Sequence, residues 1–119
     1  MAKILVIDDD PRIRRLIGRI LSGEGHDVAA AENGNDGLRR FRADQPALVI
    51  SDLLMPEKEG IETICEIRRE APSIPILAIS GGSHGLFLDI ATALGASRAL
   101  SKPFRSAELI EVVNQLLGG

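Results

Sequence analysis

The 119-residue sequence predicts a doubly wound α/β domain with five parallel strands in the order 2-1-3-4-5 and five helices over the two faces of the sheet. Two observations support this fold class. Short runs of aliphatic residues alternate with longer segments in which apolar residues recur every three or four positions, as strands alternate with crossover helices. The strand-like runs are continuously apolar, which is typical of strands covered on both faces.

The composition fits one globular domain over residues 1–119, with 45% apolar and 26% charged residues. The net charge of −3 gives no basic surface, so the domain is not expected to bind nucleic acid directly. No apolar run reaches the length of a membrane span and no signal-peptide pattern precedes the first strand, so we expect no membrane association and a cytoplasmic location. The single cysteine, Cys65, excludes an internal disulfide and is expected to be buried.

The first two strand–helix units are clearly punctuated. Residues 3–7 form a strand that ends in three aspartates, of which Asp10 is placed as the N-cap of a helix that begins at Pro11. That helix is expected to bury one stripe, formed by Ile13, Leu16, Ile17, Ile20 and Leu21. Its arginines at positions 12, 14, 15 and 19 are interpreted as a solvated face. Residues 27–31 form a weaker strand, and a helix with Leu38 and Phe41 in the core begins at Asn33 and Gly34.

The rest of the chain continues the alternation of strands and helices. The apolar run 47–50 leads into Asp52 as the third strand, and residues 59–70 form a helix with Ile61, Ile64, Cys65 and Ile67 inward. Residues 73–80 contain the fourth strand, with Pro75 at its first turn. A helix over 86–94, a short strand over 98–101 and a last helix complete the chain; the apolar positions of that helix are Leu109, Val112, Val113, Leu116 and Leu117.

Polar residues mark the carboxyl ends of four predicted strands. They are Asp8 and Asp9 after the first, Asp52 after the third, Ser80 after the fourth and Lys102 after the fifth. In a flavodoxin-like sheet the site lies beyond these ends, at the switch point between the first and third strands. Taken alone, Asp52 is better explained as the cap of a turn, since Asp is a common turn residue. The other residues favour a site.

These residues allow one particular chemistry. Three carboxylates and one lysine carry a local charge of −3 + 1 = −2, which a divalent cation would relieve. Hard oxygen ligands favour Mg²⁺ over Zn²⁺, and neither His26 nor His84 has a partner at ligand spacing, so both are expected at the surface. A carboxylate can act as nucleophile and form an aspartyl phosphate, a role we assign to Asp52. Ser80 and Lys102 could donate hydrogen bonds to the phosphoryl oxygens.

The combined motifs resemble the receiver (response regulator) domain of two-component signalling over the whole chain; they are Asp8-Asp9, Asp52 with Met55-Pro56 and Gly60, Ser80-Gly81, and Lys102-Pro103-Phe104. The resemblance implies that Asp52 accepts a phosphoryl group from a histidine kinase or a histidine phosphotransfer protein. It implies Mg²⁺ bound directly by Asp9, Asp52 and the backbone carbonyl of Leu54, and by Asp8 mainly through water. It also implies a cis Lys102–Pro103 peptide.

Further expectations follow from the resemblance. The chain is similar to stand-alone receivers, although a receiver cut from a longer protein would look the same. Receivers are not enzymes in the usual sense, but they take phosphate slowly from small donors and hydrolyse their own acyl phosphate. Output would pass to a downstream protein through the face formed by the fourth helix, fifth strand and fifth helix, in a monomer or weak homodimer. In the fourth helix, three consecutive residues are apolar, so at least one of them is expected to be exposed; they are Leu86, Phe87 and Leu88.

Three positions depart from the family pattern. Ala99 stands where receivers usually carry Tyr or Phe, so the usual aromatic lever is absent; one hypothesis is that the glycine-rich loop 81–85 moves instead, with Phe87. The structural alternative is that Phe87 belongs to the core. The resemblance implies that the positions of Leu54 and Gly82 tune how water reaches the acyl phosphate. Neither residue has a side chain that can position water by hydrogen bonding, which predicts slow self-dephosphorylation.

Other protein classes fit less well. A flavin-binding protein could use Gly81-Gly82-Ser83 to hold a phosphate, but it would not explain the acidic pair or the lysine, and the chain has no Trp or Tyr for stacking. A phosphatase with a nucleophilic Asp52 would want a carboxylate two residues later, where Leu54 stands. A pseudo-receiver that acts as a protein-interaction module without phosphorylation is compatible with Ala99.

Overall fold

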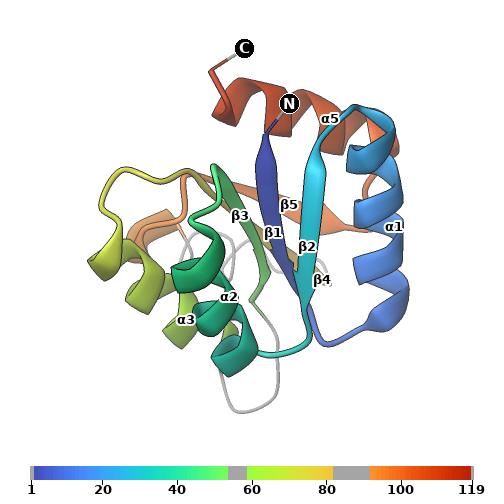
Figure 1. Cartoon of the computed structure of the whole chain (residues 1–119). Coiled ribbons are helices and arrows are strands. Elements are labelled where there is room, and N and C mark those ends of the chain that lie inside the picture. Colours follow the sequence, from blue (N-terminus) through green and yellow to red (C-terminus); the bar gives the residue numbers. More distant parts are fainter. Residues whose placement is uncertain (1, 54–58, 82–91, 119) are drawn as a thin grey trace.

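The structure is a computed structural model that describes residues 2–53, 59–81 and 92–118. Five strands form one parallel sheet in the order β2-β1-β3-β4-β5, which confirms the predicted topology (Figure 1). The strands are β1 (Lys3–Ile7), β2 (Asp27–Ala31), β3 (Leu48–Asp52), β4 (Ile76–Gly81) and β5 (Arg98–Lys102). β4 begins one residue after Pro75, so the prediction of Pro75 inside the strand was wrong. Proline has no N–H to donate, although its carbonyl still accepts from the Val49 N–H at 3.1 Å.

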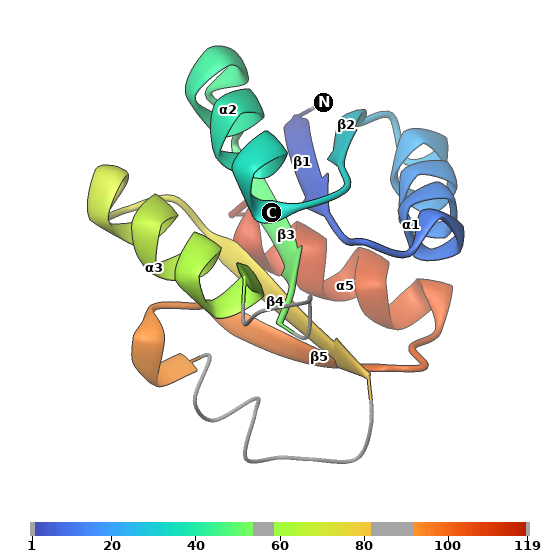
Figure 2. The same cartoon turned by 90° about the horizontal axis from the view of Figure 1, so that it is seen from below.

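Helices cover both faces of the sheet, α1 (Pro11–Gly23) and α5 (Ser106–Leu116) on one and α2 (Gly34–Asp44) and α3 (Glu59–Glu70) on the other (Figures 1 and 2). Asp10 caps α1 by accepting from the Arg12 N–H at 2.9 Å, and Asn33 caps α2 by accepting from the Asp36 N–H at 2.8 Å. Residues 92–94 are helical, and the rest of the helix expected over 86–94 lies outside the described residues.

The alternation of side chains along each strand divides the interior into two cores. In β1, Ile4 and Val6 pack with the residues of α1 and α5, whereas Leu5 and Ile7 pack with those of α2 and α3. Both sets are buried, which explains why the strand is apolar at every position. The α2 side also holds Phe41, and the fold therefore matches the core contacts predicted for that helix.

Some of the predicted core positions of the helices are less buried than expected. Leu16 is 44% exposed, because the helical rotation places it roughly 120° from the midpoint of the buried pair Ile17 and Leu21. Cys65 is half-buried, whereas Thr63 of the same helix is buried. None of the helices in the described ranges is long and apolar enough to cross a membrane.

Candidate functional site

The parallel register brings the predicted site residues to one edge of the sheet. Ile7 pairs with Ser51, so β1 and β3 end side by side and present Asp8 and Asp52 at the switch point. Ser80 lies opposite Ser101 and Gly81 opposite Lys102, which brings the end of β5 to the same edge. The expected convergence of four strand ends is therefore observed.

An acidic cluster forms where β1 and β3 end. Asp8, Asp9 and Asp52 each offer a carboxylate oxygen, and these oxygens lie within 4.8 Å of one another. Asp8 and Asp52 are 1% and 4% exposed, whereas Asp9 is exposed to solvent. Three hard oxygen donors with one open side suit a cation that keeps several water ligands, which is the preference of Mg²⁺.

Lys102 reaches into this cluster from the end of β5. Its Nζ donates to Asp8 Oδ2 at 3.0 Å and lies 3.5 Å from Asp52 Oδ2. Burial acts to lower the pKa of Lys102, but the hydrogen bond to Asp8 and the charges of Asp52 and Asp8 outweigh it and raise the pKa above its usual value. The ammonium is thus held in its charged form beside the two buried carboxylates. The Lys102–Pro103 peptide is cis, as the family resemblance implied.

Asp8 is held at each of its polar groups. Its N–H donates to the Ala31 carbonyl at 3.1 Å, and its Oδ1 accepts from the Asp10 N–H at 2.9 Å. Its backbone carbonyl accepts from Arg14 Nη1 at 2.7 Å. The interpretation of the α1 arginines as a uniformly solvated face was therefore wrong for Arg14, which is half-buried and turns toward the site.

Further polar contacts lie at the flanks of the site. The hydrogen bonds from the Arg12 side chain and backbone N–H to Asp10 lower the pKa of that carboxyl. Ser80 is 1% exposed, and its hydroxyl donates to the Gly81 carbonyl at 3.4 Å. The backbone carbonyl of Leu54, the remaining implied metal ligand, lies outside the described residues, as do Gly82, Phe87 and the tip of the glycine-rich loop.

Gly60 shapes the site although the sequence analysis gave it no separate role. It stands in the first turn of α3, and a Cβ on it would lie 2.2 Å from the Asp52 carbonyl oxygen and 2.7 Å from that of Leu53. The helix therefore begins directly against the end of β3, which only a residue without a side chain permits. His26 also differs from its prediction, because it is half-buried and its Nδ1 accepts from the Ala2 N–H at 3.2 Å.

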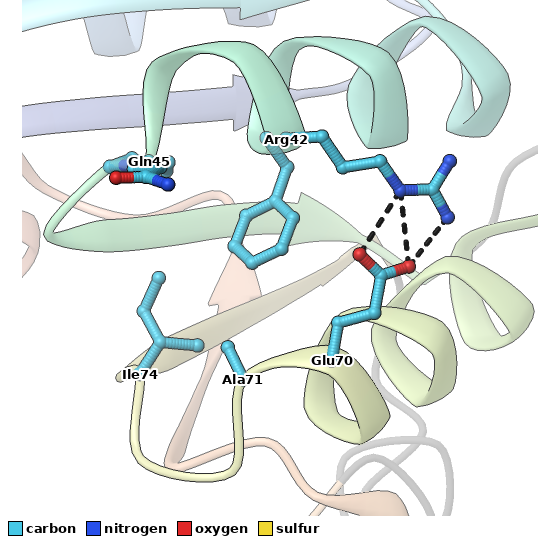
Figure 3. Close-up of a pocket in the computed structure, with 7 residues that line it drawn as sticks. Arg42, Gln45, Glu70, Ala71 and Ile74 are labelled. Atoms are coloured by element: carbon cyan, nitrogen blue, oxygen red, sulfur yellow. Dashed lines mark hydrogen bonds and ion pairs between the residues drawn. The ribbon is translucent and has the colours of Figure 1, made fainter.

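A separate hollow of about 440 Å³ lies between the carboxyl ends of α2 and α3, near the start of β4 (Figure 3). Phe41, Ala71 and Ile74 form its apolar wall. Arg42 and Glu70 form an ion pair across its rim, which lowers the pKa of Glu70 through the Arg42 hydrogen bond. The hollow lies near the amino ends of the strands, so it is not part of the acidic site. No sequence signal pointed to it.

Comparisons with known proteins agree with this geometry. The chain is 36% identical over 118 residues to the transcriptional regulatory protein GlrR of Escherichia coli. The matched region covers 98% of this chain but 26% of GlrR. It is 34% identical to the CpxR homolog of Haemophilus influenzae, over 98% of this chain and 51% of that protein. The chain thus spans about a quarter to a half of the length of these curated relatives.

Solved structures repeat the whole fold. The receiver domain of NtrX from Brucella abortus superposes with a TM-score of 0.93 at 32% identity and covers 97% of this chain and 98% of that one. The chemotaxis protein CheY4 from Vibrio cholerae superposes with a TM-score of 0.90 at 28% identity, over 98% of each chain.

The fold and the site together define a flavodoxin-like α/β domain with an acidic pocket and a lysine at its switch point. The family model of the response regulator receiver domain matches residues 4–114, and the chain belongs to this family.

Proposed function

We propose that the chain is the phosphoacceptor module of a two-component or phosphorelay system, in which Asp52 receives a phosphoryl group from a histidine kinase or a histidine phosphotransfer protein. The observation that carries this proposal is the clustering of the Asp8, Asp9 and Asp52 carboxylates with the Lys102 ammonium at the strand ends. Membership of the receiver family gives the proposal its donor class.

The donor set fits a hard divalent cation. Asp9 and Asp52 would bind Mg²⁺ directly and Asp8 mainly through water, with the Leu54 carbonyl as a further ligand that the family resemblance implies. When bound, Mg²⁺ supplies positive charge that offsets both the carboxylates and the phosphoryl oxygens. The exposed position of Asp9 leaves one side of the cluster open to solvent and to the phosphodonor.

The residues of the chain supply position and charge for the transfer. A carboxylate oxygen of Asp52 forms the new bond to phosphorus, while the P–N bond to the donor histidine breaks and its electron pair stays with the imidazole. The product is an acyl phosphate on Asp52. Lys102, already 3.5 Å from the Asp52 carboxylate, is placed to donate to the phosphoryl oxygens, and Ser80 would turn its hydroxyl toward them.

The transfer changes the charge of the site. Asp52 carries one negative charge as a carboxylate and about −1.5 to −2 as an acyl phosphate, by analogy with other phosphorylated side chains. Lys102 would then gain a more strongly charged partner than Asp8, its present hydrogen-bond partner. This exchange of Lys102 partners at the end of β5 is a local change that could alter the contacts of the domain with other proteins.

The wider role follows from the family and from the surface charge. We infer output through altered protein–protein contacts of the output face that the family resemblance implies, to which β5 and α5 belong, in a cytoplasmic protein that is a monomer or weak homodimer. The names of GlrR and the CpxR homolog describe transcriptional regulators, but the net charge of −3 of this chain favours protein partners over nucleic acid for the domain itself. The module is not an enzyme beyond slow reaction with small phosphodonors and slow loss of its own phosphate.

The test is phosphorylation with a small acyl phosphate and Mg²⁺, followed by intact mass, because the chain has no Trp for a fluorescence readout. Wild type and an Asp44→Asn control, a carboxylate outside the site, should each gain one phosphate, whereas Asp52→Asn should gain none. EDTA should abolish the gain. Phosphate on Asp52→Asn would reject Asp52 as the acceptor, and an inert wild type that still binds Mg²⁺ would favour a pseudo-receiver that acts through contacts alone.

A further inference from the structure

Arg14 differs from the other arginines of α1. Arg12, Arg15 and Arg19 are exposed, whereas Arg14 is half-buried and its Nη1 donates to the Asp8 carbonyl at 2.7 Å. No carboxylate lies within ion-pairing distance of its guanidinium among the residues that the structure describes, although it stands near the acidic cluster. The hydrogen-bond partner of the Arg14 guanidinium is thus a backbone carbonyl rather than an acid.

The carbonyl that Arg14 holds is part of the peptide that joins Asp8 to Asp9. A peptide unit is planar, so fixing this oxygen fixes the direction in which the chain enters Asp9. The next peptide is held as well, because the Asp10 N–H donates to Asp8 Oδ1 at 2.9 Å. Both peptides that flank Asp9 therefore have a side-chain partner.

The Asp9 side chain depends on this framework. It is exposed and has no ion pair or hydrogen bond with another described residue, so its carboxylate is directed by the backbone on either side. The same carboxylate lies within 4.8 Å of those of Asp8 and Asp52. A small rotation of the peptide between Asp8 and Asp9 would move it out of the cluster.

We propose that Arg14 is a positioning residue of the acidic site, which holds the peptide between Asp8 and Asp9 so that the Asp9 carboxylate faces Asp52. This inference rests on the proposed function, because the ligand that the arrangement serves is Mg²⁺. It extends the site from the strand ends to the first turns of α1, by one charged hydrogen bond.

The sign of one measurement separates positioning from charge. Removing a positive charge near three carboxylates strengthens their attraction for a cation. If Arg14 acted by its charge alone, a variant without that charge would therefore bind Mg²⁺ more tightly than wild type. If Arg14 acts by position, the variant would bind Mg²⁺ more weakly. Arg15→Gln is the matched control, because it removes the same charge one residue away from an exposed position.

The experiment is a Mg²⁺ titration of ¹⁵N-labelled full chain, followed by the amide shifts of residues 8–10, for wild type, Arg14→Gln, Arg14→Lys and Arg15→Gln. We expect Arg14→Gln to raise the dissociation constant at least threefold and Arg15→Gln to leave it equal or lower. Arg14→Lys keeps a charged donor but not the guanidinium geometry, so it should recover part of the loss but not all of it. Melting temperatures of the four proteins without metal show whether each is folded.

The outcomes are distinct. Arg14→Gln that binds Mg²⁺ as tightly as Arg15→Gln, or more tightly, would overturn the positioning role and leave the proposed function intact. If Arg14→Gln does not fold, Arg14→Lys decides by comparison with wild type, because both carry the same charge. Weaker Mg²⁺ binding by Arg14→Lys would support the positioning role, and binding equal to that of wild type would overturn it. A wild type that fails to bind Mg²⁺ would overturn the proposed function and this inference together.

Discussion

At the scale of single residues, Arg68 of α3 joins two segments through backbone carbonyls, the turn directly after its own helix and the segment before β5. Its Nε and Nη2 donate to the Gly95 carbonyl at 3.0 and 2.8 Å, and its Nη1 donates to the carbonyls of Ala71 and Pro72 at 3.1 and 3.0 Å. Gly95 has a positive φ of 123°, and a Cβ there would lie 2.9 Å from the Arg68 side chain.

Replacement of Arg68 by Met should lower the free energy of unfolding by about 2 kcal/mol, because several partly buried carbonyls lose a charged donor. Arg69→Met is the control. Arg69 is exposed and pairs with Glu66 at the surface, so its loss should stay within about 0.5 kcal/mol. Urea unfolding followed by far-UV circular dichroism measures both. Equal losses would show that the Arg68 hydrogen bonds contribute no more than a surface ion pair.

Individual residues also show what a linear sequence leaves open. The sequence indicated an arginine-rich helix, but whether Arg14 turns inward depends on where the Asp8 carbonyl lies after the sheet has formed. Leu16 could not be distinguished from Ile17 by spacing, because both fit the period of the helix. Their different exposure depends on the position of α1 relative to the sheet.

At the scale of elements, local chemistry predicted most boundaries. Asp10 with Pro11 and Asn33 with Gly34 mark helix starts that the structure confirms, and α3 has the predicted bounds of 59–70. The start of β4 was placed too early, because an apolar run continues through Pro75 but the ladder of hydrogen bonds cannot. The point where a helix contacts a strand could not be predicted from the sequence, as the close contact of Gly60 with the end of β3 shows.

Gly60→Ala should lower the free energy of unfolding by about 1–3 kcal/mol, since the added methyl group meets backbone oxygens that cannot move aside as a flexible side chain would. We also expect weaker Mg²⁺ binding, because one of those oxygens belongs to Asp52. Gly23→Ala at the end of α1 is the control: a Cβ there meets nothing within 4 Å, so the change should be neutral or stabilising by up to about 1 kcal/mol. Thermal unfolding with and without Mg²⁺ measures both effects, and similar behaviour of the two variants would exclude close packing of α3 on β3.

At the scale of the whole molecule, the fold was predictable because its rules are general. Continuous apolar strands indicated a sheet covered on both faces, the handedness of crossovers limited the strand order, and the edge of the sheet gathered the predicted polar residues. The partner of Lys102 was not predictable. Its Nζ lies closer to Asp8 than to Asp52, which depends on side-chain geometry that spacing does not encode.

The same convergence has a cost for the whole domain. Folding brings three carboxylates within 4.8 Å of one another in a chain whose net charge is already −3, and only Lys102 forms an ion pair with them among the described residues. Two of the three are buried, so their repulsion is weakly screened. We therefore expect the cluster to destabilise the fold when no cation is bound.

Asp9→Asn should reveal this cost, because it removes one charge of the cluster from a residue without a described ion pair. In EDTA we expect the variant to unfold at a higher temperature than wild type; a gain on the order of 1 kcal/mol would raise the melting temperature by roughly 4 °C. With Mg²⁺ the difference in melting temperature between the two proteins should narrow or reverse, since binding stabilises wild type by mass action and the variant lacks one of the proposed ligands. Asp27→Asn at the start of β2 is the control, because it removes the same charge far from the cluster and should not change the melting temperature in EDTA or with Mg²⁺. An equal gain in that control would show that net charge, rather than the assembled site, sets the stability of the metal-free domain.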